Sequence, residues 1–74
     1  MDKFDVLSEV TGSIWKILVK AGDTVQEGEQ LAVCESMKME IPVEAEEGGC
    51  ILEIRVNEGD LIKEGDVLMI IEVK

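Results

Sequence analysis

The sequence has 74 residues, of which 17 are Asp or Glu and 7 are Lys or Arg, giving a net charge of −10. A chain this short forms one small core, and its hydrophobic content of 46% excludes a disordered tail. The negative charge repels phosphates, so neither nucleic acid nor an anionic membrane surface is expected as a partner. We interpret the excess of acid as a solubility device, with a docking role for the acidic face as the alternative.

The cysteines and the N-terminus bear on the compartment. Cys34 and Cys50 are the only cysteines and histidine is absent, so the chain cannot form a four-ligand zinc site unaided, and no metal is expected. The N-terminal residues lack the apolar segment of an export signal, and no apolar run approaches the ~18 residues that a membrane span needs. We therefore expect a cytoplasmic protein with reduced cysteines.

The sequence repeats itself at an offset of 37 positions. Residues 12–31 align with residues 49–68, and the identities fall on turn glycines and on alternate apolar positions. They include Gly12/Gly49, Ile14/Ile51, Gly22/Gly59, Asp23/Asp60, Gly28/Gly65 and Leu31/Leu68. Matches of this kind at one offset indicate an internal duplication.

Each half is predicted to contain four short strands. In the first half they span residues 4–10, 13–19, 24–25 and 30–35, and in the second half 40–46, 50–56, 61–62 and 67–72. These segments are rich in β-branched residues with a period near two, and Gly-Asp pairs supply turns between them. The two-residue strands, Thr24-Val25 and Leu61-Ile62, are expected to place apolar side chains in the core. Pro42 is expected on an edge strand because it lacks an N–H donor.

The duplication predicts the architecture. Two four-strand halves are expected to pack about a pseudo-twofold axis as a flattened eight-strand barrel or sandwich, since each half alone leaves an apolar face wet. The expected fold class is therefore all-β, with residues 1–74 as a single domain. Lys38 lies at the joint between the halves, and its symmetry equivalent falls just past the C-terminus. We expect the joint, and Lys38 with it, at the end of the domain opposite the termini.

The joint Glu35-Ser36-Met37-Lys38-Met39-Glu40 breaks the rules of turn chemistry. If the flanking strands pair, Met37 and Lys38 form a two-residue hairpin tip, where both residues need positive φ and Asn-Gly or Asp-Gly is usual. Such a departure marks a candidate functional site. The exposed methionines would form an adaptable recognition surface, the alternatives being a core role for them and an ordinary solvated charge for Lys38. Acylation of Lys38 would need an enzyme that supplies an activated acyl group and a base.

The segment from Glu35 to Ile41 resembles the attachment motif of the biotinyl domains of biotin-dependent carboxylases and decarboxylases. Residues 4–73 are similar as a whole to short, stand-alone biotin/lipoyl attachment proteins. The resemblance implies the barrel-sandwich hybrid fold, with biotin in amide linkage to Lys38. It also implies that Met37 and Met39 are read by a biotin protein ligase and by the carboxylating partner. The neighbouring recognition context would be Glu35, Ser36 and Glu40.

The sequence departs from the family pattern in its loops. Val10-Thr11-Gly12 stands where Met-Pro-Gly is frequent, and Ala45-Glu46 stands where Ala-Pro is frequent. The inserted thumb of some bacterial carrier proteins has no counterpart between Gly12 and Glu35. These differences affect loop rigidity and leave the attachment motif intact.

The resemblance implies a non-catalytic carrier, monomeric in isolation, that moves carboxybiotin between biotin carboxylase and carboxyltransferase sites. One alternative is a lipoyl carrier of 2-oxo acid dehydrogenase complexes or a lipoyl relay, with lipoate in place of biotin. Lipoyl hairpins usually read Asp-Lys-Ala, and Met37 and Met39 argue against that assignment. A further alternative is an unmodified protein-interaction module.

Overall fold

The computed structural model describes residues 2–73, which form eight strands and no helix. The strands are β1 (Asp2–Leu7), β2 (Gly12–Ile17), β3 (Thr24–Val25), β4 (Gln30–Ser36), β5 (Met39–Glu44), β6 (Gly49–Ile54), β7 (Leu61–Ile62) and β8 (Val67–Val73). The all-β class is therefore confirmed for the described residues. None of them lies in a helix that is long and apolar enough to cross a bilayer.

The strands form two antiparallel sheets with the orders β1-β8-β6-β3 and β5-β4-β2-β7. Each sheet takes two strands from each half of the sequence, so the halves interleave instead of forming one sheet each. The expected eight-strand, two-sheet architecture is confirmed in its sandwich form, and the described strands do not close into a barrel. The outer strands β1 and β5 pair only with β8 and β4, and the described strands remain two separate sheets.

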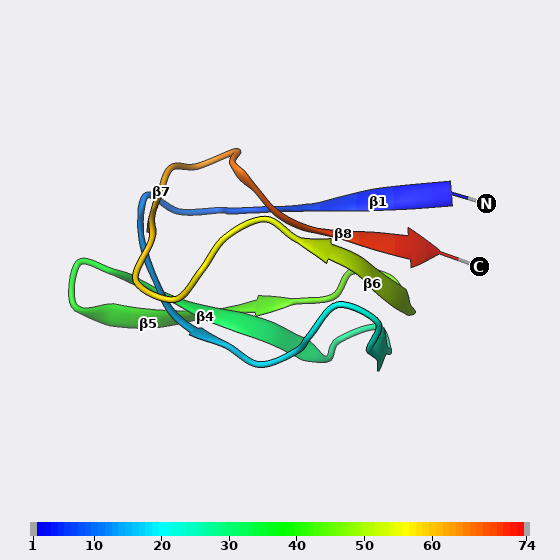
Figure 1. Ribbon diagram of the computed structural model, residues 1–74. Coiled ribbons are helices and arrows are strands. Elements are labelled where there is room, and N and C mark those ends of the chain that lie inside the picture. The colour runs from blue at the N-terminus through cyan, green and yellow to red at the C-terminus, as the bar shows by residue number, and fades with distance from the viewer. Residues whose placement is uncertain (1, 74) are drawn as a thin grey trace.

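The internal duplication is confirmed strand by strand. Every strand of the first half has an equivalent of the same length 37 positions later: β1 with β5, β2 with β6, β3 with β7 and β4 with β8. The backbone hydrogen bonds repeat as well. The Ile14 N–H donates to the Asp60 carbonyl at 2.9 Å, and the Ile51 N–H donates to the Asp23 carbonyl at 2.8 Å. The domain is therefore a pseudo-twofold structure with the β4–β5 hairpin at the end opposite the two termini (Figure 1).

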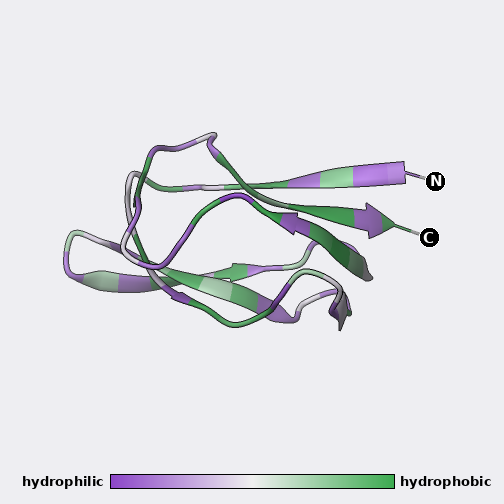
Figure 2. Ribbon diagram, in the orientation of Figure 1, coloured by the Kyte–Doolittle hydropathy of each residue, from purple (hydrophilic) through white to green (hydrophobic). Residues whose placement is uncertain are grey.

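The core lies between the two sheets and forms two clusters. The larger cluster includes Val6, Val25, Leu31, Ile51, Met69 and Ile71. The smaller cluster consists of Ile14, Cys34, Ile62 and Leu68. Apolar segments follow β4 and β8 along the inside of the structure, whereas the connecting loops are largely hydrophilic (Figure 2). Burial of these aliphatic side chains is the main force that holds the sheets together.

The short strands and the proline occupy the places expected of them, with one exception. Val25 and Ile62 are fully buried, and Pro42 lies on the edge strand β5. Leu61 was expected in the core, but its side chain is 87% exposed. Because successive side chains of a strand point to opposite faces, the burial of Ile62 forces Leu61 outward.

The first strand of each half ends earlier than predicted, at Leu7 instead of Val10 and at Glu44 instead of Glu46. The Ser8 Oγ donates to the Val10 carbonyl at 2.6 Å and accepts a hydrogen bond from the Val10 N–H at 3.3 Å. This local side-chain turn competes with the ladder at the end of β1. The equivalent position after β5 is Ala45, which cannot form such a turn.

Candidate functional site

The β4–β5 hairpin ends in a two-residue turn made by Met37 and Lys38. Ser36 pairs with Met39 as the last rung of the ladder. Both turn residues have positive φ, 52° for Met37 and 64° for Lys38, and they are the only non-glycine residues in this region among residues 2–73. The predicted tip and its backbone conformation are therefore confirmed. The ladder on either side fixes a turn that neither side chain favours.

A second local penalty lies directly below the turn. Glu35 and Glu40 face each other across the ladder, and both are exposed. Like charges at opposite positions destabilise an antiparallel pair. Turn chemistry and cross-strand pairing thus both disfavour this hairpin, and the contacts of the rest of the sheet must offset the cost.

The hairpin is held by its contact with the start of β2. The Ser36 Oγ donates to the Thr11 carbonyl at 2.8 Å. Gly12 lies so close to β4 that a Cβ at this position would collide with the carbonyl oxygen of Glu35. The backbones of Gly12 and Glu35 can approach closely because glycine has no side chain, and this contact anchors the base of the turn.

The side chains around the tip form an exposed apolar surface. Met37 is 91% exposed, Met39 is 64% exposed, and Leu61 on β7 is nearly as exposed as Met37. Met37 and Leu61 border a hollow of about 720 Å³ together with Lys38 and Thr11, whereas Met39 does not line it. The core role considered for the methionines is excluded by their exposure. Residues Met37, Met39 and Leu61 are called the tip surface below.

The pseudo-twofold symmetry provides an internal comparison for the tip surface. At the opposite end of the domain, Asp2 is the equivalent of Met39, and Thr24 is the equivalent of Leu61. The same fold position is therefore polar at the terminal end and apolar at the lysine end. Sequence reasoning missed Leu61, although its replacement by threonine in the other half was the available signal.

Lys38 itself is exposed, and within residues 2–73 its amine forms no ion pair and no side-chain hydrogen bond. By contrast, the amine of Lys16 lies 4.9 Å from the centre of the Trp15 ring. No side chain that could act as an acid or base for the Lys38 amine is hydrogen-bonded to it among the described residues. The hairpin therefore presents an accessible amine.

The two cysteines are free and lie in different sheets, Cys34 on β4 and Cys50 on β6. Burial raises the pKa of the Cys34 thiol above its ordinary value, which keeps it neutral and unreactive. Cys50 is half-buried, with its Sγ 3.6 Å from the Gly22 carbonyl oxygen. No three His, Cys, Asp or Glu side chains among residues 2–73 are placed to hold a metal ion.

The chain is similar to a known protein family and to curated proteins. The model of a family described as biotin-requiring enzymes matches residues 5–71. A biotin/lipoyl attachment protein of Bacillus subtilis is 50% identical over 38 residues, which are 51% of this chain and 52% of that protein. A biotinylated protein TB7.3 homolog of Mycolicibacterium smegmatis is 49% identical over 39 residues, 53% of this chain and 55% of that protein. Each match thus spans about half the length of the curated relative.

Solved structures share the fold over nearly the whole chain. The Kluyveromyces lactis urea carboxylase superposes with a TM-score of 0.91 at 33% identity, covering 97% of this chain and 6% of that one. A single-chain, multi-domain long-chain acyl-CoA carboxylase superposes with a TM-score of 0.92 at 22% identity, covering 97% of this chain and 7% of that one. The second likeness shows the fold alone.

Proposed function

The chain belongs to the family of biotin-requiring enzymes, whose model covers residues 5–71, and from this premise we propose that it is a carrier domain that receives biotin covalently on Lys38. A carrier of this kind is not itself an enzyme. The biotinylated relatives support biotin as the cofactor. The observation that carries the choice of Lys38 is its backbone: it is the only lysine of the described chain in a left-handed turn.

The residues around Lys38 fit an attachment site. The amine is exposed and free of ion pairs within the described chain, so it is open to an acyl donor. Ser36 and Gly12 hold the base of the hairpin, so that the strained turn keeps one orientation. Met37 and Met39 flank Lys38 in the sequence and are exposed, so they offer soft apolar contacts that suit recognition by a ligase.

Attachment is an acyl transfer performed by a biotin protein ligase. The Lys38 nitrogen forms a bond to the carbonyl carbon of an activated biotinyl group, the activating group leaves, and a base of the ligase takes the proton of the amine. When bound, biotin supplies a ureido nitrogen that carries a carboxyl group. The chain's own contribution is to hold this arm at the end of a small rigid domain. Tethering replaces diffusion with a high effective concentration at each partner site.

The proposed partners are a biotin carboxylase and a carboxyltransferase, besides the ligase. The superposition on urea carboxylase at 33% identity supports a carboxylase as the assembly in which the carrier works. We further propose that the isolated domain is monomeric and works in the cytoplasm. The free thiols of Cys34 and Cys50 are consistent with a reducing compartment.

Intact-mass measurement after coexpression with a biotin ligase tests the site. The expected result is a single biotin adduct on the unaltered chain and none on Lys38→Arg, which keeps the charge but cannot form the amide. Lys63→Arg is the matched control, because Lys63 borders the same hollow and should leave the adduct intact. An adduct that persists in Lys38→Arg would overturn the assignment.

Lipoyl attachment at Lys38 is the second candidate, because the Bacillus subtilis relative is named for both cofactors. The hairpin geometry suits either acyl group, since both attach through an amide to an exposed amine. The mass of the adduct on protein from the native host distinguishes the two cofactors directly. A lipoyl adduct there would replace biotin in the proposal and leave Lys38 as the site.

A further inference from the structure

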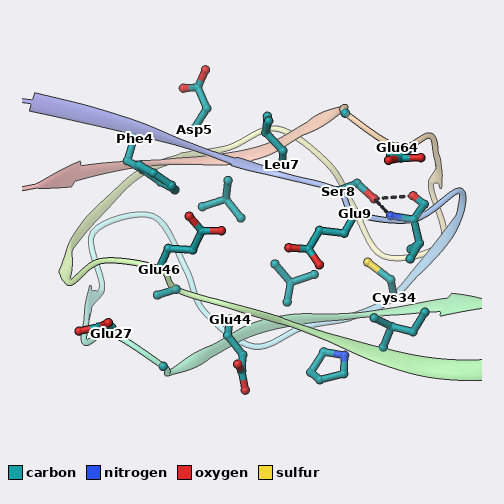
Figure 3. A pocket seen from close by; sticks show the side chains of 18 residues that line it. Phe4, Asp5, Leu7, Ser8, Glu9, Glu27, Cys34, Glu44, Glu46 and Glu64 are labelled. Atoms are coloured by element: carbon teal, nitrogen blue, oxygen red, sulfur yellow. Dashed lines mark hydrogen bonds between the residues drawn. The ribbon is translucent and has the colours of Figure 1, made fainter.

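A groove of about 990 Å³ runs between the edge strands β1 and β5, on the side where the two sheets do not join (Figure 3). Each of these strands has a partner on one side only, β8 for β1 and β4 for β5. Their outer backbone N–H and C=O groups are therefore available to another chain. The volume is in the range of pockets that bind ligands.

The floor of the groove is apolar, and most of it belongs to the larger core cluster or packs against that cluster. Residues that line it include Phe4, Val6, Ile41, Val43 and Ala45. Val6 and Ala45 are buried, whereas Phe4, Ile41 and Val43 are half-buried. The half-buried side chains leave apolar surface that an occupant with apolar groups could cover.

The rim of the groove is acidic throughout. None of the described lining residues is Lys or Arg. Six carboxylates line the groove, those of Asp5, Glu9, Glu27, Glu44, Glu46 and Glu64. All six are exposed. The one ion pair of the described chain, between Arg55 and Glu53, lies elsewhere. The negative charge of the groove is therefore not neutralised by this chain.

Four of these carboxylates follow the pseudo-twofold symmetry. Glu9 and Glu46 are identical residues 37 positions apart, as are Glu27 and Glu64. Glu9 and Glu46 extend into the space between β1 and β5, whereas Glu27 and Glu64 lie towards the two ends of the groove (Figure 3). Like charges that face one another beside an apolar floor raise the local negative potential. A cationic group between them would relieve this repulsion.

We propose that the groove binds an extended segment of a partner protein in which cationic and apolar side chains alternate. Side chains of a strand alternate between two faces, so one face can cover the apolar floor while the cationic side chains reach the carboxylates. Pairing is expected along β1, because Pro42 removes one N–H donor from β5. Main-chain hydrogen bonds would supply affinity, and the carboxylates would supply specificity.

The groove and the lysine hairpin are separate places on the domain. Met37, Lys38 and Met39 do not line the groove, which lies along the body of the domain. A segment bound there leaves Lys38 free, so the domain could be held by a partner while its arm moves. The inference does not rest on the proposed function, since Lys38 is not among the residues that line the groove.

Fluorescence anisotropy with a labelled octapeptide of alternating lysine and valine tests the proposal on the unmodified chain. We expect Glu9→Gln/Glu46→Gln to weaken binding by about tenfold or more, because both carboxylates extend into the groove. The matched control is Glu53→Gln/Glu58→Gln, which changes the net charge equally outside the groove. The amide oxygen that replaces the Glu58 carboxylate can still accept from the Ile17 N–H. Equal weakening by both pairs would mean unspecific attraction and would overturn the proposal.

Two further probes distinguish binding of a peptide in the groove from nonspecific binding of cations to the acidic surface. An octapeptide of alternating lysine and serine lacks the apolar face and is expected to bind at least about tenfold more weakly. Spermine carries the charge without a peptide backbone and should not compete at equal concentration. Backbone amide NMR shifts caused by the lysine-valine peptide should fall on β1 and not on Met37 or Lys38. Equal binding of either alternative probe, or shifts confined to the hairpin, would refute the assignment.

Discussion

Met37 and Lys38 follow each other in the left-handed backbone region, with φ of 52° and 64°, at the tip of the hairpin between β4 and β5. Each non-glycine residue held in this conformation costs on the order of 1 kcal/mol. The hairpin therefore keeps its lysine at the expense of stability. That trade is typical of a functional site in a fold that otherwise obeys turn chemistry.

Replacing the tip with the preferred residues should stabilise the domain. In Met37→Asn/Lys38→Gly, both residues adopt positive φ readily, so the free energy of unfolding should rise by about 1–3 kcal/mol. Urea denaturation measures the change. The control is Met37→Leu, which keeps the strain and should leave stability near that of the unaltered chain. A double variant no more stable than this control would show that the turn is not strained.

The duplication and the turn rule sufficed to predict the all-β class, the position of the tip and its unusual backbone. They could not predict which strands pair, because a shared period of two fits sheets built within each half and sheets built between halves equally well. The end of β1 depended on a side-chain turn at Ser8 that apolar patterning does not reveal. Leu61 was assigned to the core because it adjoins Ile62, and only the direction of the β7 side chains decides between them.

Gly12 and Gly49 occupy equivalent positions but support different ends of the domain. A Cβ would collide with the Glu35 carbonyl oxygen at Gly12 and with the Glu72 carbonyl oxygen at Gly49. Gly12→Ala and Gly49→Ala should each lower the free energy of unfolding by about 1–3 kcal/mol, as overpacking does. Only Gly12→Ala should also slow biotin transfer to the folded protein, because Gly12 abuts the base of the hairpin. Equal transfer rates for the two variants would show that hairpin position does not affect the reaction.

The buried thiol of Cys34 makes the free energy of unfolding depend on pH in the alkaline range. Its pKa is raised from 9.0 by burial, so the unfolded chain loses this proton at a lower pH than the folded chain does. The neutral Cys34 thiol contributes its full stabilisation below about pH 9, and this stabilisation is lost as the pH rises through the pKa of the folded state. The free energy of unfolding should therefore fall over this pH range. Urea titrations from pH 8 to pH 10 should show this decline, and Cys34→Ala should show less of it. A matching decline in Cys34→Ala would assign the effect to other groups.

The same burial predicts selective thiol labelling. A thiol-disulfide reagent such as Ellman's reagent should modify Cys50 in the folded protein, because that residue is only half-buried, and Cys34 only after unfolding. The variants Cys34→Ala and Cys50→Ala identify which thiol reacts. Fast labelling of Cys34 in folded Cys50→Ala would contradict the packing described for β4.

Met37 and Met39 are expected to determine which of the two cofactors is attached to Lys38. Met37→Asp/Met39→Ala removes the apolar side chains beside Lys38 and should shift attachment from biotin to lipoate when both attachment enzymes are coexpressed. Intact mass separates the two adducts. Met37→Leu/Met39→Leu retains apolar side chains and should remain biotinylated. Unchanged biotin incorporation in the Asp/Ala variant would show that the methionines do not discriminate.

Leu61 should contribute to recognition without contributing to stability. Its side chain lies in solvent beside the hollow that Lys38 borders, and the equivalent residue at the other end of the domain is Thr24. Leu61→Thr should therefore lower kcat/KM for ligase-catalysed biotin transfer by about fivefold or more, the loss expected when an apolar contact of an interface is truncated. The melting temperature should not change. Leu52→Thr is the control, since Leu52 is also exposed but lies on β6 outside the hollow. If both variants slow transfer alike, surface hydrophobicity in general, and not the tip surface, attracts the ligase.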